Sequence, residues 1–444
     1  MDPAQYRLTI SREEQGCIAC LSATSPPPRH RYGRMVRPQV VIQAMTRSLA
    51  IHVFTRITVD HGVGGGMEQH LQQLAEGLAE RGHTITVVTT AHPAGLREIG
   101  RDGVRFLFLP GTTPGTYSRQ WWRASRAVLG ALPRADILWS QSVGARSVAG
   151  APGVPPAVAW MHGTTMSLWR TGRTQLAADP SPRMLLAVAR QGLAGVRSIW
   201  QARRSHFAAI IAPSRQQARD VAWEFGVPVD RVAVIYNAAD TTHFRPDPEA
   251  GRRLRAEAGL SEDSPLLLFV GRLVAPKGAE TALTVLRSLR QEGQDAHLWI
   301  VGTGPESARL QAESDDLGHA VRFWGFQPTE RLPAFYNAAD LTLMPTRYDE
   351  AFSLVVVEAL ACGTVLLASN RGGNLEAVED GISGRLLPAT NPGVWSQVVS
   401  VLLHDPAQRR AFSVAARRRA EREFSLMRML DQAEALFVEV ANGR

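Results

Sequence analysis

Two glutamates, Glu350 and Glu358, lie in the apolar stretch YDEAFSLVVVEALACG at residues 348–363, with seven residues between them. Paired carboxylates first suggest a glycosidase, in which the two acids act across roughly 5–9.5 Å. Eight helical steps of about 1.5 Å would instead separate these two by roughly 12 Å. Carboxylates at that distance can accept hydrogen bonds from separate hydroxyl groups of one extended, polyhydroxylated ligand. The spacing therefore indicates sugar binding rather than glycoside hydrolysis.

The elements around this stretch would position both acids. Strand-like runs at residues 341–344 and 364–368 flank it, which predicts a strand–helix–strand unit. Ser353 can cap a helix over residues 354–361, and Gly363 can end that helix. A helix N-terminus favours a phosphate, and ligands of open parallel sheets bind at the carboxyl ends of the strands. We therefore expect this loop to bind a sugar that is attached to a phosphate.

A second candidate group surrounds Lys277, the only lysine among the 49 basic residues of the chain. It belongs to FVGRLVAPKG at residues 269–278, after a buried-strand pattern at 266–270 and before a helix that should begin near Ala279. Arg272 offers a planar fork and Lys277 a compact charge, so the two can converge on one anion. A solvated loop lysine is the alternative, but the nearby glycines and the acid pair favour an anion site.

Both segments resemble the signature of retaining glycosyltransferase family 4, whose members have the two-domain GT-B fold. The resemblance extends over roughly residues 48–440, and several motifs in the right order are more specific than any lone glycine pattern. The further motifs are GGGMEQHLQQLAEGLAERGHTITVVTT at residues 64–90, MHGTT at 161–165, IIAPSRQQARD and VAVIYNAAD ending at Asp240, and SNRGGNLEAVEDGISGRLLP at 369–388.

The resemblance implies an α/β protein with two doubly wound, Rossmann-like domains that face each other across a cleft. Residues 47–240 would form the acceptor-side domain and residues 241–425 the donor-side domain, with a linker at 245–251. Residues 426–444 would be a helix that returns to the first domain. A length of 444 residues suits two such domains. Residues 1–46 are Pro-rich and Arg-dense, and we expect them to be disordered.

The resemblance also implies a role for each charged residue of the site. Arg272 and Lys277 match the pair that holds the donor diphosphate and stabilises it as it leaves. Glu350 matches the residue that binds hydroxyls of the transferred sugar, and Glu358 the one that accepts hydrogen bonds from the ribose. His162 resembles the loop histidine that contacts the donor sugar near the reacting carbon.

Seven further positions would contact the donor, mostly through the backbone. Gly65 and Gly66 match glycines that let backbone N–H groups approach the diphosphate from the first domain. The remaining five are Phe352, Ser353 and Leu354 for the sugar or phosphate, and Gly325 and Phe326 for the base. The loop reads Ala-Phe-Ser at residues 351–353, where Gly-Phe-Gly is frequent in the family, and this departure leaves the identity of the sugar open.

The implied function is transfer of a hexose-type sugar from a nucleotide-diphospho-sugar to an acceptor hydroxyl, with retention of the anomeric configuration. The unidentified acceptor would be a glycan, a glycolipid or a natural product. The donor is a co-substrate, and neither a cofactor nor a metal is expected, since the chain has no short Asp-x-Asp motif. A nucleotide-sugar epimerase of related fold and a non-catalytic sugar-nucleotide-binding protein are the alternatives. A glycan phosphorylase would need Lys277 for pyridoxal phosphate, and that lysine belongs to the glycine loop.

Charge is unevenly distributed along the chain. Residues 1–245 contain 28 basic and 15 acidic side chains, whereas residues 246–444 contain 21 and 26. A basic N-terminal half can attract an anionic membrane, and no nucleic-acid-binding motif supports a nucleic-acid partner.

Two sets of residues repeat every seven positions in a helix-like stretch at 183–207: Arg183, Arg190, Arg197 and Arg204, and Leu186, Leu193 and Trp200. This pattern fits an ordinary surface helix with a solvated Arg face, and a helix that docks on a membrane is the alternative hypothesis.

Cysteine usage and hydropathy suggest a compartment. Three cysteines in the chain fit a reducing cytoplasm, and Cys17 and Cys20 have no second pair with which to complete a zinc site. No apolar run reaches about 18 residues, and the N-terminus has no apolar segment typical of a signal peptide. We expect a cytoplasmic protein, with peripheral association at the inner face of the membrane as a hypothesis.

Overall fold

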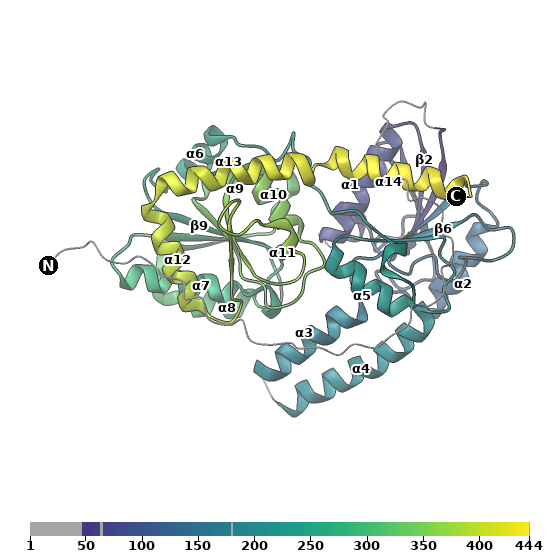
Figure 1. The fold of residues 1–444 in the computed structure, drawn as a ribbon, viewed down its shortest axis with the longest axis horizontal. Coiled ribbons are helices and arrows are strands. Elements are labelled where there is room, and N and C mark those ends of the chain that lie inside the picture. Colours follow the sequence, from purple (N-terminus) through teal and green to yellow (C-terminus); the bar gives the residue numbers. More distant parts are fainter. Residues whose placement is uncertain (1–46, 63–64, 179–180, 444) are drawn as a thin grey trace, which may run out of the picture. The chain divides into compact units, whose positions relative to one another are not determined.

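The computed structural model describes residues 47–62, 65–178 and 181–443. The expected disorder of residues 1–46 and the Cys17–Cys20 pair lie outside the described residues. Within them, helices cover two mainly parallel sheets (Figure 1). Alternate residues of the central strands pack in different core clusters. Leu266 and Leu268 pack in one core cluster, whereas Leu267 packs in another. This two-sided burial explains why the strands are continuously apolar in sequence.

The first sheet has eight strands among the described residues, in the order β3-β4-β2-β1-β5-β6-β7-β8, and β3 is antiparallel to β4. Its strands are β1 (Ala50–Phe54), β2 (Thr84–Thr90), β3 (Glu98–Arg101), β4 (Val104–Leu109), β5 (Ile137–Gln141), β6 (Ala157–Trp160), β7 (Ala209–Ala212) and β8 (Val232–Val234). The helices of this part are α1 (Gly66–Glu80), α2 (Arg119–Leu129), α3 (Thr165–Ala178), α4 (Pro182–Ala202) and α5 (Arg215–Phe225), with short 3-10 turns at η1 (Val59–His61) and η2 (Val229–Arg231).

The second sheet has six parallel strands among the described residues, in the order β11-β10-β9-β12-β13-β14. Its strands are β9 (Leu266–Val270), β10 (His297–Val301), β11 (Val321–Gly325), β12 (Leu341–Met344), β13 (Val365–Ser369) and β14 (Arg385–Leu387). Its helices are α6 (Pro248–Glu257), α7 (Ala279–Gln291), α8 (Ser307–Glu313), α9 (Leu332–Ala338), α10 (Leu354–Cys362), α11 (Asn374–Ala377), α12 (Pro392–His404) and α13 (Pro406–Glu423), with η3 (Ala275–Lys277), η4 (Asp315–Ala320) and η5 (Thr329–Arg331).

The strand order of the second sheet reverses at β9. From β9 the chain adds β10 and β11 on one side, then crosses to place β12 on the other side. β12 pairs directly with β9, with Leu341 opposite Leu267 and Thr342 opposite Leu268. The loops that leave β9 and β12 at their carboxyl ends therefore diverge around a topological switch point, where open α/β sheets bind ligands.

Most elements expected from the sequence form within a residue or two of their expected bounds. The helix after Ser353 extends one residue further than expected, and β13 begins one residue later. The expected linker at residues 245–251 is wrong in its second half, because α6 already begins at Pro248. Asp247 explains this start, since its side chain accepts a hydrogen bond from the Ala250 N–H at 2.9 Å and the proline at the first helical position is preorganised.

The last helix, α14 (Leu426–Ala441), lies against the first sheet and α1 (Figure 1). Phe437 is fully buried, with its ring centroid 6.0 Å from that of Trp139 on β5. Glu434 on the same helix accepts hydrogen bonds from Arg81 at 2.7 Å and pairs with His83 at 3.1 Å. Apolar burial, the Arg81–Glu434 ion pair and the His83–Glu434 hydrogen bond together hold the C-terminal segment in place.

Replacing Phe437 with alanine should lower the free energy of unfolding by about 3–5 kcal/mol, because it leaves a cavity between α14 and β5. Met427 on the same helix is exposed, so Met427→Ala is the matched control and should change that free energy by less than ~0.5 kcal/mol. Urea unfolding followed by circular dichroism measures both. Equal effects of the two substitutions would contradict the described packing of α14.

Candidate active site

The loops after β9 and β12 enter one cavity of about 840 Å³. The loop after β9 contributes Arg272 and Lys277, and the loop after β12 contributes Tyr348 and Glu350. The N-terminal ends of α1 and α10 line the same cavity, so backbone N–H groups and basic side chains meet there. Such a lining favours an anionic ligand with polar groups on either side.

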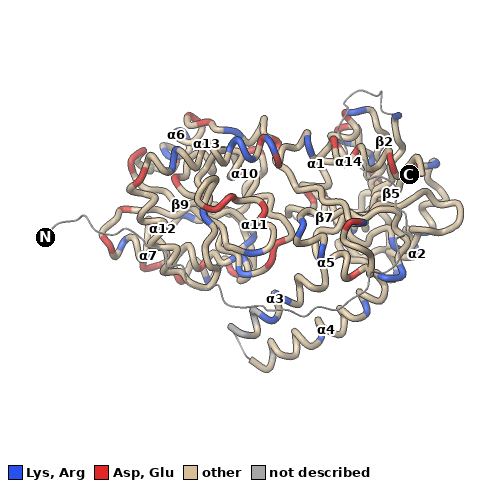
Figure 2. The backbone as a smooth tube through the Cα atoms, viewed as in Figure 1, with Lys and Arg blue, Asp and Glu red and all other residues tan. Residues whose placement is uncertain are grey.

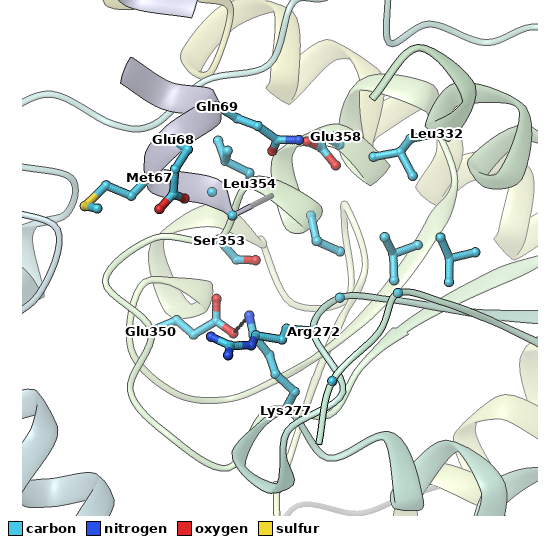
Figure 3. A pocket seen from close by; sticks show the side chains of 18 of the residues that line it. Met67, Glu68, Gln69, Arg272, Lys277, Leu332, Glu350, Ser353, Leu354 and Glu358 are labelled. Atoms are coloured by element: carbon cyan, nitrogen blue, oxygen red, sulfur yellow. Dashed lines mark hydrogen bonds and ion pairs between the residues drawn. The ribbon is translucent and has the colours of Figure 1, made fainter. Parts of the chain in front are cut away.

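An ion pair joins the two loops across the cavity (Figure 3). The Lys277 Nζ lies 2.6 Å from the Glu350 Oε1, and the two side chains are only 16% and 7% exposed. Burial alone would lower the pKa of Lys277, but the charge of Glu350 and the Tyr348 hydroxyl raise it above the ordinary value of 10.5. Burial, and after it Glu350, raises the pKa of Tyr348. At neutral pH Lys277 is therefore an ammonium and Tyr348 a neutral phenol.

Backbone contacts hold the two loops close enough for this pair to form. Gly278 has a φ of +75°, and a Cβ there would lie 2.1 Å from the Pro345 carbonyl oxygen at the end of β12. Only glycine allows that approach together with that backbone conformation. On the other side, the Gly373 N–H donates to the Glu350 carbonyl at 2.8 Å. The Glu350 loop is thus held between the β9 loop and the segment that follows β13.

The second acid, Glu358, lies inside α10 and is 5% exposed. The Tyr336 hydroxyl donates to its Oε2 at 2.8 Å. Burial raises the pKa of Glu358 to about 7, against a smaller lowering effect of the Tyr336 hydrogen bond. Ser353 stands at the N-cap position of α10, but the expected side-chain cap is wrong: its side chain makes no capping hydrogen bond and lines the cavity instead. The two acids thus occupy different environments, one ion-paired and one close to half-protonated at neutral pH.

The first sheet contributes the start of α1 to the cavity. Gly65 and Gly66 lie at the N-terminus of this helix, and the Glu68 side chain lies over Gly65. Burial raises the pKa of Glu68, while its own backbone N–H, Arg56 and Arg272 lower it. The neighbouring Gln69 reaches η5 of the other sheet and donates to the Thr329 hydroxyl at 2.7 Å.

His162 follows β6 and faces the cavity from the same side. Its Nε2 is hydrogen-bonded to the side-chain oxygen of Gln141. Its ring meets that of His70 edge-on, with the centroids 4.7 Å apart. Burial lowers the pKa of His162 to about 4. The imidazole is therefore neutral at neutral pH and acts as a hydrogen-bonding group rather than as a charge.

The structure brings nearly all residues singled out from the sequence to this one cavity. The predicted residues that line it are Gly65, Gly66, His162, Arg272, Lys277, Phe326, Glu350, Phe352, Ser353, Leu354 and Glu358. Gly325 does not line it, because this residue ends β11 and its carbonyl accepts a hydrogen bond from the Gly302 N–H at 2.7 Å. Several polar lining residues were missed, among them Glu68, Gln69, Asn237 and Tyr348. All four of these belong to motifs quoted from the sequence, where a polar side chain near a glycine or an acid was the available signal.

No group of three or more side chains that could ligate a metal occurs within the described ranges. The expectation that the reaction needs neither metal nor cofactor stays a prediction. The lining instead offers two cations, three carboxylates and a neutral imidazole, a set suited to a ligand with both phosphate and hydroxyl groups.

Comparison with known proteins agrees with this chemistry. Residues 64–243 match the family described as Glycosyltransferase Family 4, and residues 252–419 match Glycosyl transferases group 1. The D-inositol 3-phosphate glycosyltransferase of Xylanimonas cellulosilytica is 29% identical over 413 residues, or 88% of this chain and 95% of that protein. The GDP-mannose-dependent alpha-(1-6)-phosphatidylinositol monomannoside mannosyltransferase of Mycolicibacterium smegmatis is 38% identical over 186 residues, or 40% of this chain and 48% of that one.

Solved structures show the same fold. Sucrose-phosphate synthase from Thermosynechococcus elongatus superimposes with a TM-score of 0.74 at 22% identity, over 89% of this chain and all of that one. Anabaena HepE in complex with UDP-glucose gives a TM-score of 0.67 at 20% identity, over 87% of this chain and 99% of that one. The chain therefore belongs to glycosyltransferase family 4, has the GT-B fold with two Rossmann-like domains, and is a glycosyltransferase.

Proposed function

We propose that this enzyme transfers a hexose-type sugar from a nucleotide-diphospho-sugar to an acceptor hydroxyl, with retention of the anomeric configuration. The observation that carries the proposal is the buried Lys277–Glu350 pair beside Arg272 at the switch point of the second sheet. Two cations can balance the charge of a diphosphate there, while the carboxylate faces the sugar. The UDP-glucose bound by the structurally similar HepE protein supports a donor of this class.

The donor would lie extended along the cavity. Figure 3 shows Glu358 and the Lys277–Glu350 pair on opposite sides of Ser353. The ribose hydroxyls would bind Glu358, the diphosphate would bind Arg272 and Lys277, and the sugar would bind Glu350. Phe326, an exposed ring in the lining, would lie by the base. Each ligand group then meets a side chain of suitable hydrogen-bonding type.

Cleavage of the sugar–phosphate bond leaves negative charge on the departing diphosphate. Arg272 and Lys277 would stabilise that charge, and the leaving phosphate would accept the proton of the acceptor hydroxyl on the same face of the sugar. Glu350 is held by Lys277, so its charge serves binding rather than nucleophilic attack. Neutral His162 would contribute a hydrogen bond near the reacting carbon.

The names of two relatives support a choice of acceptor to test. One is named for inositol 3-phosphate and another for a phosphatidylinositol mannoside. A hydroxyl of a phosphorylated or lipid-linked polyol is therefore the acceptor to test first. The names also favour transfer over epimerisation or non-catalytic binding.

Nucleoside diphosphates should stabilise the protein, and a nucleotide at 100 times its Kd should add about 2.7 kcal/mol to the free energy of unfolding. A thermal-shift screen that includes UDP and GDP identifies the nucleotide. The matching α-linked sugar nucleotide, incubated with inositol 3-phosphate, should then give an α-linked product by NMR. A β-linked product would contradict retention, and an epimerised donor without acceptor would contradict transfer.

Lys277 should react slowly with an amine-acylating reagent at neutral pH, because its ammonium is buried and paired with Glu350. Glu350→Gln should speed the reaction by removing the paired charge, and a bound nucleoside diphosphate should slow it further. Since Lys277 is the only lysine, peptide mass spectrometry reads this one site, and the α-amino group of the same chain is the internal control. Equal labelling with and without a saturating nucleotide would remove Lys277 from the diphosphate site.

Nucleotide affinity should fall as the pH drops below about 7, because protonated Glu358 loses its capacity to accept from both ribose hydroxyls. The fall approaches tenfold per pH unit. Glu358→Gln should bind the nucleotide more weakly at high pH, and its affinity should depend less on pH. The nucleotide's own ionisation affects wild type and variant equally, so it cancels when their affinities are compared at each pH. Calorimetric titration measures both.

The stability of the ligand-free protein independently tests whether folding raises the pKa of Glu358. A pKa raised on folding means that the folded state binds the Glu358 proton more tightly, so this stabilisation is present below about 4.5 and is lost as the pH rises through about 7. Wild type should therefore lose stability relative to Glu358→Gln across that interval. A constant difference would show that Glu358 does not titrate there.

A further inference from the structure

The helices α3 and α4 form a hairpin that projects away from the sheets (Figure 1). One face of α4 packs on α3, and Gly195 allows the close contact, since a Cβ there would lie 2.5 Å from the Thr165 methyl group. The opposite face of α4 has no partner within the described residues and points to solvent. The α4 helix has 21 residues, so this face is roughly 31 Å long.

The solvent-facing side of α4 is apolar along its whole length. Five large apolar side chains on it are between 51% and 76% exposed: Leu185, Leu186, Leu193, Val196 and Trp200. Three of them recur every seven residues, a spacing that drifts by only about 20° per repeat, so they form one stripe. Isolated exposed apolar residues are ordinary, whereas a continuous stripe on the helix face that lacks a described partner indicates an interaction surface.

Basic residues flank this stripe, and acids are nearly absent. Arg190 and Arg197 lie on one edge of it, at the same seven-residue period. Residues 165–204 contain seven Arg and a single acid, Asp179. Figure 2 shows Arg but neither Asp nor Glu on the described parts of α3 and α4. The surface is therefore complementary to a negatively charged partner.

Tryptophan and arginine gather around the same hairpin. The three exposed tryptophans of the described chain lie on α3, α4 and α5, and each has a guanidinium near its ring. The pairs are Arg173 with Trp169 at 4.8 Å, Arg204 with Trp200 at 3.8 Å, and Arg203 with Trp223 at 6.0 Å. Rings with one apolar and one polar side, beside long basic side chains, suit the headgroup region of a bilayer.

The hairpin is attached directly to the cavity. Its first residue, Thr165, lies three positions after His162, and its N–H and hydroxyl donate to Glu224 at 2.8 and 3.0 Å. Arg170 on α3 lies 3.6 Å from Asp349, the residue before Glu350. A surface bound by α4 would therefore lie at a fixed position relative to the active site.

We propose that the outer face of α4 binds the surface of an anionic phospholipid bilayer, with the apolar stripe in the headgroup–acyl boundary and Arg190 and Arg197 on lipid phosphates. No described helix is long and apolar enough to cross a membrane, and a basic amphipathic helix of this kind lies in the plane of the interface. The binding does not depend on the proposed donor chemistry, and with that chemistry it would present a lipid-linked acceptor to the cavity.

Flotation of the full chain with vesicles tests the proposal. Vesicles of phosphatidylcholine alone are compared with an equimolar phosphatidylcholine–phosphatidylglycerol mixture. Wild type should bind the anionic vesicles at least about tenfold more tightly, because each basic residue near the surface contributes about fivefold. Arg190→Gln together with Arg197→Gln should weaken that binding about 25-fold. Leu186→Glu together with Leu193→Glu should abolish it, because charge replaces the apolar insertion.

Matched controls lie on the second half of the chain. Val401→Glu changes an apolar side chain that is 62% exposed on α12, and Arg418→Gln removes an exposed charge on α13. Both should bind as wild type does. The nucleotide-induced thermal shift, measured without lipid, should be unchanged in every variant, which separates loss of docking from loss of the donor site.

Three results would overturn the proposal. They are that wild type binds neither vesicle, that the Leu186→Glu, Leu193→Glu double variant floats as wild type does, or that the controls lose binding equally. Sedimentation of wild type that shows a dimer abolished by the same double variant, without vesicle binding, would assign the stripe to a second copy of the chain. The two arginine substitutions keep the test decisive if the leucine variant does not fold.

Discussion

A buried ammonium paired with a buried carboxylate is the interaction on which the active site depends. Lys277 and Glu350 are 2.6 Å apart and largely removed from water. Desolvation of two charges is offset only by close geometry and further polar partners. Here Gly278 allows the two loops to touch, and Tyr348 adds a polar neighbour. The pair therefore both requires and stabilises the arrangement of loops that forms the cavity.

The reversal of strand order supplies that arrangement. Because β12 lies next to β9, loops separated by more than seventy residues leave the sheet side by side. The α10 helix follows at once and places Glu358 in the same cavity. Two glutamates that lie close together in the sequence thus acquire different properties. Glu350 forms an ion pair with Lys277. Glu358 accepts a hydrogen bond from the Tyr336 hydroxyl, and burial raises its pKa.

The first sheet contributes fewer charged side chains to the cavity than the second sheet does. Its part of the cavity is a helix N-terminus with two glycines and a neutral histidine. The charge of the N-terminal half lies instead on helices outside the cavity, above all on the α3–α4 hairpin. The cavity proposed to bind a soluble donor is thus separate from the basic, apolar surface beside it. This separation is the physical basis for proposing that donor and acceptor arrive from different phases.

Local patterns were sufficient to predict the α/β class, the strand–helix–strand unit around Glu358, and the position of Arg272, Lys277 and Glu350 in loops that follow strands. Apolar runs, caps and glycines act over a few residues, so they can be read directly. The pairing of Lys277 with Glu350, the exclusion of Gly325 and the entry of Glu68 could not be derived, since each depends on contacts between distant segments. Likewise the repeat at Leu186 and Leu193 predicted a helix with one apolar face, but only the packing of α3 on the other side shows that this face is open. Periodicity determines which residues share a face, and long-range packing determines what that face meets.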